Sequence, residues 1–180
     1  MKTFLFKLFA IVLIFSCSLN SAQAQTPFST DSHVLHGGFG LGGYGIGFGN
    51  GISSTPILTV TYDQGIVDDL GIGNLGIGGG FGIKYYNFDN IDASLTRMFV
   101  GARGTYHFDF VNSETFDFYA GVMIGADFYT SNIDGFEPSS SGLFGGPLAG
   151  INYWFKPNIG VYAEAGYALG ILNGGIAFNF

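Results

Sequence analysis

The stretch that decides the fold is residues 95–108, Leu-Thr-Arg-Met-Phe-Val-Gly-Ala-Arg-Gly-Thr-Tyr-His-Phe. In a β-strand, successive side chains point to opposite faces. One face of this stretch receives only apolar, aromatic and glycine residues, whereas Arg97, Arg103 and His107 all fall on the other face. A strand with one apolar and one charged face is typical of a transmembrane β-barrel, which has an apolar exterior and a polar interior.

The same alternation recurs along the chain, and none of the positions assigned to the outward face is charged. The first strand changes parity at Gly42-Gly43, as a glycine bulge would make it do. The sequence therefore predicts an all-β fold, an eight-stranded antiparallel up-and-down transmembrane β-barrel over residues 34–180. The seven further strands are expected at 34–48, 56–62, 75–86, 117–129, 149–155, 159–168 and 172–180.

Residues 1–24 have the pattern of a cleavable signal peptide. A basic start precedes an apolar run, and Ala22 and Ala24 put small residues where a signal peptidase needs them, with cleavage before Gln25. We expect residues 25–33 to be a flexible leader between this signal and the barrel.

Composition excludes several classes of protein. Cys17 is the only cysteine, and acylation of this residue in a lipoprotein signal is the alternative to cleavage. From Gln25 onward the chain carries four bases against 13 acids, a formal charge of −9, which disfavours nucleic-acid binding. No later window is long and apolar enough for a helical membrane span. Without a second cysteine, disulfides and thiolate metal sites are excluded.

The inward face carries the ionisable side chains, and a lone charge in a low-dielectric interior is costly. Arg103 and Glu164 lie at similar depths on their strands, so we expect them to meet across the lumen. Such a pair would be a structural bridge that closes the lumen, and a selectivity constriction in a narrow pore is the alternative. The ionisable residues expected to line the lumen are Lys84, Arg97, Arg103, His107, Asp117, Asp127 and Glu164.

Charge complementarity also suggests a register for the strands at 95–108 and 117–129. If paired residue numbers sum to 224, Arg97 lies opposite Asp127 and His107 lies opposite Asp117. The connections are then inner turns at 63–74, 109–116 and 156–158, and outer loops at 49–55, 87–96, 131–145 and around Gly170.

Other motifs favour no catalytic or cofactor-dependent activity. The glycine patterns at 40–45 and 71–76 match a dinucleotide fingerprint, but no helix follows either of them. His33 and His36 have a spacing that could bind metal, although solvated leader histidines are commoner. His107 and Asp117 are accompanied by no serine nucleophile. We therefore predict that the protein is not an enzyme and has no cofactor or metal.

Four segments carry a resemblance to a known family: 101–108 (GARGTYHF), 117–121 (DFYAG), 163–167 (AEAGY) and 175–180 (GIAFNF). They resemble the small outer-membrane β-barrel domain family of Bacteroidetes, which is related in architecture to the eight-stranded porin-family barrels of other Gram-negative bacteria. The resemblance implies an outer-membrane location and contact with outer-membrane lipids. An unusually glycine-rich first strand departs from it.

The function expected from these features is that of a closed structural or surface-interaction barrel. A surface ligand would be contacted through the outer loops at 87–96 and 131–145. The alternatives are a narrow porin-like channel for small solutes and a soluble lipocalin-like carrier. The carrier would need a polar exterior and an apolar interior, which is the reverse of the observed parity.

The last residues predict a partner during assembly. Ile176, Phe178 and Phe180 alternate at the C-terminus and resemble the signal by which barrel assembly machinery recognises its substrates through strand addition. Deletion of Phe180 should therefore reduce the outer-membrane yield and increase degradation in the periplasm, as measured by immunoblotting of fractionated cells. An unchanged outer-membrane yield would count against the signal.

Overall fold

The computed structural model describes residues 27–42, 52–88, 93–109, 113–131 and 142–180, and the predicted signal peptide and cleavage site lie outside them. No helix among these residues is long and apolar enough to cross a membrane. The strands are β1 (His33–Leu41), β2 (Ile52–Ser54), β3 (Ile57–Val67), β4 (Gly73–Phe88), β5 (Ala93–Phe108), β6 (Phe116–Ser131), β7 (Gly142–Lys156), β8 (Ile159–Gly166) and β9 (Leu172–Asn179).

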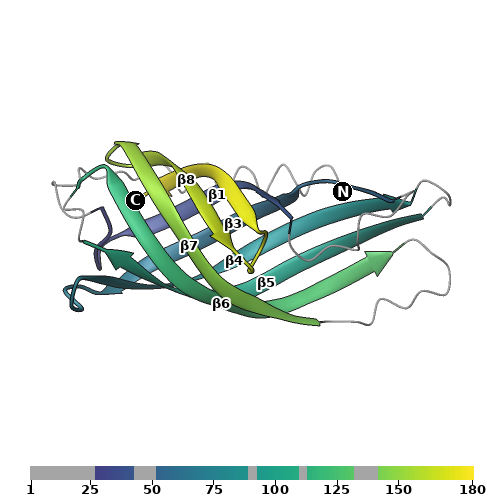
Figure 1. Ribbon diagram of the computed structural model, residues 1–180, viewed down its shortest axis with the longest axis horizontal. Coiled ribbons are helices and arrows are strands. Elements are labelled where there is room, and N and C mark those ends of the chain that lie inside the picture. Colours follow the sequence, from purple (N-terminus) through teal and green to yellow (C-terminus); the bar gives the residue numbers. More distant parts are fainter. Residues whose placement is uncertain (1–26, 43–51, 89–92, 110–112, 132–141) are drawn as a thin grey trace.

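The strands form a closed barrel (Figure 1). They pair in the order β3-β1-β9-β8-β7-β6-β5-β4, and β4 also pairs with β3, so no edge is left between first and last. The short β2 pairs with β4 on the same side as β3. Only Thr55 and Pro56 separate β2 from β3, and proline has no N–H to donate to a ladder. β2 and β3 therefore act as one interrupted strand of the barrel wall. Counted in this way, the nine strands form the eight-stranded barrel that the sequence predicts.

The side chains alternate between the two faces as predicted. On β3, Leu58 and Val60 are 57% and 48% exposed, whereas the intervening Thr59 is only 4% exposed. The outer face of the barrel is therefore apolar, and its polar groups point inward. The predicted parity change lies at the end of β1, where Gly42 has a φ of 70°, and the following residues lie outside the described ones.

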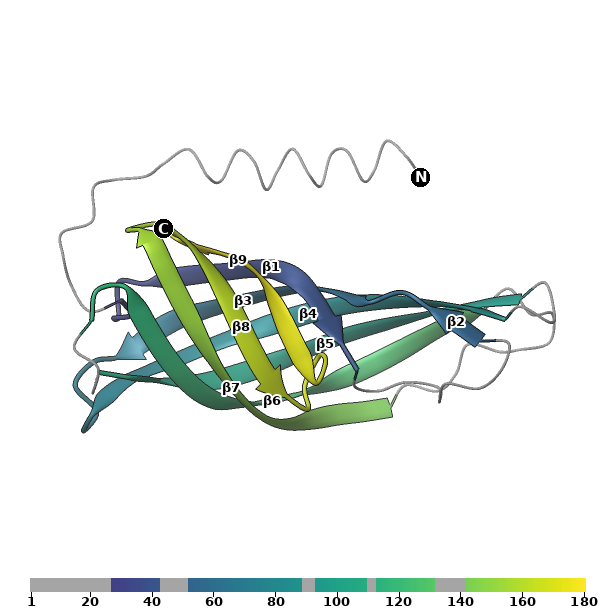
Figure 2. The same cartoon turned by 45° about the horizontal axis from the view of Figure 1, so that its top comes forward.

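The barrel wall is much taller on one side than on the other (Figure 2). β4, β5 and β6 have 16 residues each, whereas β8 and β9 have eight. At ~3.3 Å per residue this is a difference of about 26 Å along the strands. We call the end of the barrel where β1 starts and β9 ends the terminal rim. We call the opposite end, where β4 to β6 project furthest, the loop rim (Figure 2).

The inner turn predicted at 63–74 is wrong. β3 continues to Val67 and β4 begins at Gly73, so the turn is only 68–72. The prediction ended the strand at Tyr62 and placed Asp63 in the turn. In the structure Asp63 points into the lumen and is fully buried, so it continues the alternation.

The outer loops are also shorter than predicted. β7 begins at Gly142, so the 131–145 loop shrinks to 132–141, and strands β4 and β5 leave only 89–92 of the 87–96 loop. Part of the 49–55 loop is β2. The first residues of β7, up to Pro147, pair with β6 and so belong to the wall.

The predicted register between β5 and β6 is wrong by two residues. Paired numbers sum to 226, so Arg97 lies opposite Tyr129 and His107 lies opposite Tyr119. A shift of two keeps every side chain on its predicted face. The expected partners still meet, because long side chains reach diagonally to residues two positions away.

Candidate functional site

The centre of the lumen is held by a buried cluster of charges. Arg103 on β5 donates a hydrogen bond from Nη2 to Glu164 Oε2 on β8 at 2.9 Å, so the expected pair does meet across the lumen. The Tyr119 hydroxyl donates to the same carboxylate oxygen at 3.0 Å. All three side chains are at least nine-tenths buried. We call Arg103, Glu164, Tyr119 and Asp63 the central cluster.

Asp63 is the member that sequence reasoning missed. Its Oδ1 lies 3.0 Å from Arg103 Nε, as an ion pair that lacks hydrogen-bond geometry. Coulomb attraction therefore holds this carboxylate, and Arg103 faces two acids. The signal was present in the sequence, because Asp63 continues the inward parity of Thr59 and Thr61.

Glycines make these contacts possible. Gly78 lies between Asp63 and Arg103 in the sheet, paired with each of them. A Cβ at Gly78 would lie 2.8 Å from Asp63 Oδ1 and would also overlap the backbone carbonyl of Tyr62. Gly150 likewise pairs with Tyr119 on one neighbouring strand and with Glu164 on the other, and a Cβ at Gly150 would overlap the Tyr119 ring.

A second polar layer lies nearer the terminal rim. His107 Nδ1 lies 2.8 Å from Asp117 Oδ1, and Asn152 donates to Asp117 Oδ2 at 2.8 Å. The other side of the Asn152 amide contacts His36, whose Nε2 lies 2.9 Å from Oδ1. Thr105 Oγ1 contacts His107 Nε2 at 3.1 Å.

Of these residues, His36 and Asn152 were absent from the expected lumen lining. Asn152 could have been found, because it lies between the outward Ile151 and Tyr153. His36 lies in the strand expected at 34–48, but its spacing from His33 suggested only a metal site or solvated histidines; in the structure it is buried on β1, with His33 on the opposite face. The two histidines therefore do not converge on a metal. Among the described residues, no three His, Cys, Asp or Glu are grouped so as to hold a metal ion.

The leader packs against this layer instead of extending freely from the barrel. Phe28 is 1% exposed, and its ring stacks on His107 with centroids 3.5 Å apart and planes inclined by 4°. Asn74 donates to the Phe28 carbonyl at 2.6 Å. Gly65 and Gly76 leave room for the leader, because a Cβ at either would overlap Ser29 or Phe28.

Apolar side chains fill the lumen on the loop-rim side of the central cluster. Phe99 follows Arg97 and precedes Arg103 on the inward face of β5, so this layer separates two charged regions. Its ring meets Phe144 edge-on at 5.5 Å. Gly80 and Gly82 provide the space, because a Cβ at these positions would crowd the layer. The layer consists of Ile57, Phe99, Met123, Phe144, Leu148, Ala168 and Leu169.

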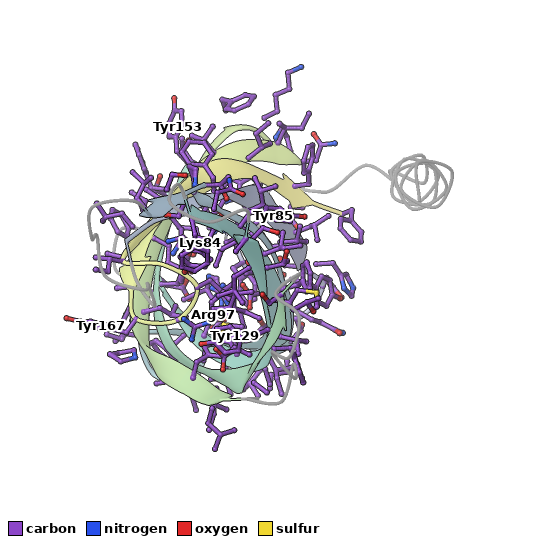
Figure 3. All side chains as sticks on the ribbon, turned by 90° about the vertical axis from the view of Figure 1, so that its right-hand side faces the viewer. Lys84, Tyr85, Arg97, Tyr129, Tyr153 and Tyr167 are labelled. Carbon is purple, nitrogen blue, oxygen red and sulfur yellow. The ribbon has the colours of Figure 1, made fainter. Side chains whose placement is uncertain are left out.

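The charges nearest the loop rim form a third polar layer. Arg97 donates from Nε to Asp127 Oδ2 at 2.6 Å. Its guanidinium also lies 4.8 Å from the ring centroids of both Phe99 and Tyr129. Lys84 lies directly opposite Arg97 on the neighbouring strand. Figure 3 shows Lys84, Arg97 and Tyr129 inside the ring of strands.

The arrangement resembles a hydrolase site in one respect only. Thr105, His107 and Asp117 are connected as a hydroxyl, an imidazole and a carboxylate. A hydrolase needs substrate to reach the hydroxyl. All three residues are at most 3% exposed, and Phe28 covers the imidazole face. The connection therefore orients a buried histidine and offers no surface for a substrate.

Comparisons with known proteins support the fold. No protein-family model and no curated protein sequence matches the chain. Among solved structures, the outer membrane protein Ail of Yersinia pestis in a phospholipid bilayer nanodisc is similar, with 16% identity and a TM-score of 0.53 over 83% of this chain and 99% of that one. At this identity the likeness establishes the barrel fold.

Two further structures give lower scores. The N-terminal β-barrel domain of Pseudomonas aeruginosa OprF matches with 16% identity and a TM-score of 0.47, over 84% of this chain and 98% of that one. A crystal structure of Ail gives the same identity and score, over 84% and 96%. The resemblance to a Bacteroidetes family stays a prediction.

We predict that Glu164→Gln lowers the stability of the barrel without preventing its formation. Breaking a buried ion pair costs ~3–5 kcal/mol, and the remaining Asp63 should keep the loss near the lower end. Urea unfolding in detergent micelles measures it. Glu114→Gln, at an exposed carboxylate in a turn, should be neutral, and equal effects of the two substitutions would contradict the central cluster.

A second prediction concerns the glycine between Asp63 and Arg103. Gly78→Ala should be destabilising by about 1–3 kcal/mol, because a side chain there overpacks the wall. Gly104→Ala is the matched control, since a Cβ at that position meets nothing within 4 Å. Comparable unfolding midpoints for both variants would show that Gly78 is not needed for the contact.

Proposed function

We propose that the protein is an outer-membrane β-barrel of a Gram-negative bacterium, with a closed lumen and a structural or surface-interaction role. The observation that carries the proposal is the inversion of polarity across the wall. Val122 and Ile124 on β6 are 64% and 67% exposed, whereas Asp117 and Asp127 on the same strand are buried. Such a surface is stable against lipid, and it would be an aggregation hazard in water.

The dimensions of the apolar surface agree with a bilayer. Outward aromatic residues lie on β6 at Phe118 and Phe128, ten positions apart. This is about 33 Å along the strand and about 25 Å in height at a tilt of ~35–45°, close to the height of the apolar band in outer-membrane barrels. At the terminal rim, Phe116 and Tyr153 pack together with centroids 5.1 Å apart, as in an interfacial aromatic girdle.

The filled lumen favours a closed barrel over a channel. The central cluster and the apolar layer occupy the interior at successive depths, and Phe28 covers the terminal-rim end. The same polarity argues against a lipocalin-like carrier, whose interior would have to be apolar. The buried connection of Thr105, His107 and Asp117 supports a protein that is not an enzyme.

The proposed partners follow from the same surfaces. Outer-membrane lipids would contact the apolar band, and Ail, the similar barrel, was studied in a phospholipid bilayer. Barrel assembly machinery would recognise Ile176, Phe178 and Phe180. A surface ligand would meet the tall side of the barrel, where β4 to β6 project at the loop rim.

We predict that a charge in the apolar band prevents stable insertion. Val122→Arg should destabilise the folded barrel by ~2–4 kcal/mol, the cost of a cation at the bilayer midplane. Thr130→Arg is the matched control, because Thr130 lies outward on the same strand but beyond Phe128. Outer-membrane fractionation and the difference in gel mobility between unboiled and boiled samples measure the folded fraction.

Two outcomes would overturn the proposed function. Recovery of the wild-type protein in the soluble periplasmic fraction would favour the carrier. Steady ion conductance of the purified barrel in planar bilayers would favour the channel.

A further inference from the structure

We propose that the lumen at the loop rim is a binding site for an oxyanion, a phosphate or sulfate group, held by Lys84 and Arg97. This inference rests on the surface-interaction role in one respect, because it needs the loop rim to face the medium. Binding by the folded barrel in detergent can nevertheless be measured whether or not that role is correct.

The first observation is an excess of positive charge. Lys84 and Arg97 are direct cross-strand neighbours on β4 and β5, both point inward, and they are 8% and 9% exposed. The only carboxylate that the described residues place with them is Asp127, which binds Arg97. Among the residues that the structure describes, two cations therefore share one carboxylate. Like charges directly opposite each other on a sheet are destabilising unless something neutralises them.

The second observation is the environment of Lys84. Its Nζ lies 5.2 Å from the centroid of the Tyr86 ring. Within the part of the chain that the structure describes, this cation–π contact is its one interaction, with neither an ion pair nor a hydrogen bond. A cation–π contact orients an ammonium group and leaves its charge in place. Lys84 is thus a largely buried cation, and none of its three N–H donors has an acceptor among the described residues.

The pair of residues suits an oxyanion. Lysine offers an oxyanion a compact point charge with three N–H donors. The Nε and Nη2 groups of Arg97 are engaged by Asp127, so Arg97 contributes chiefly its positive charge beside Lys84. The rings of Phe99 and Tyr129 fix the Arg97 guanidinium at 4.8 Å, so less side-chain freedom is lost when a ligand binds.

The layers of side chains beneath Lys84 and Arg97 would let an anion bind at the loop rim but not pass through the lumen. The apolar layer that contains Phe99 and Phe144 lies beneath the cations. Further down, Arg103 is matched by the two carboxylates of Asp63 and Glu164, which leaves one negative charge. An anion that enters at the loop rim is attracted by the first layer and excluded by the next two.

The same chemistry could be offered by a free anion or by the head group of a lipid. Both cations point into the lumen, away from the apolar outer face, which favours an anion that enters from the solvent. A further competitor is an acid from the chain's own connections at 89–92 and 132–141, which lie outside the described residues. The experiment separates these three sources.

The test is titration of the folded barrel in zwitterionic detergent with inorganic phosphate, followed by calorimetry and ³¹P line broadening, with sodium chloride at equal ionic strength as the salt control. The proposal expects saturable phosphate binding. Lys84→Met should weaken it about tenfold or more, as expected for loss of a charge-assisted hydrogen bond. Lys84→Arg should retain it.

The controls keep folding and binding apart. Lys84→Met removes one of two facing cations and should fold at least as well as wild type, which the gel-mobility assay verifies. Lys156→Met removes an exposed lysine at the terminal rim and should leave phosphate affinity unchanged. Loss of gel-mobility difference in wild type would refute the barrel itself, independently of any result with phosphate.

Four results would overturn the oxyanion site. The first is no phosphate binding beyond the chloride control. The second is equal binding by Lys84→Met. The third is binding that appears only after the acids of the two connections, Asp89, Asp92, Asp134 and Glu137, are neutralised, because the chain itself would then fill the site. Binding of phosphatidic acid vesicles without binding of inorganic phosphate would assign the cations to lipid and also refute it.

Discussion

The buried guanidinium of Arg103 is the constraint on which the rest of the lumen depends. A charge inside a narrow barrel has no bulk water, so carboxylates must converge on it from other strands. They come from β3 and β8, on two sides of the ring, and so tie together wall positions that share no backbone hydrogen bonds.

The glycines follow from that constraint. An eight-stranded interior has little volume, and the ionic, aromatic and apolar layers compete for it. Glycine opposite several of the large inward side chains removes the competition, as Gly78 does for Asp63 and Arg103. The glycine content that would suggest disorder in a soluble chain here reflects close packing across a small lumen.

Most of the fold could be predicted because the alternation has a period of two, and period alone assigns each residue to a face. The period cannot fix the register, since a slip of two leaves both faces intact, and charge matching was misled because Arg97 reaches diagonally to Asp127. The end of β3 was missed because the turn expected at 63–74 took in Asp63, which in the structure continues the inward face. Phe28 gave no signal at all, since nothing in an isolated aromatic residue shows that it will stack on His107.

The seating of Phe28 bears on the order in which the barrel is assembled. Its ring and carbonyl contacts lie on β4 and β5, but the same side chain is also buried in a cluster with residues of β1, β7, β8 and β9, namely Val34, Trp154, Tyr162 and Ala177. The seam that closes the ring joins β1 to β9, with Val34 opposite Asn179. Contacts between distant parts of a chain form late because closing a long loop costs more entropy. The seat of Phe28 is therefore complete only when β9 joins β1, and closing the ring also locks the leader in place.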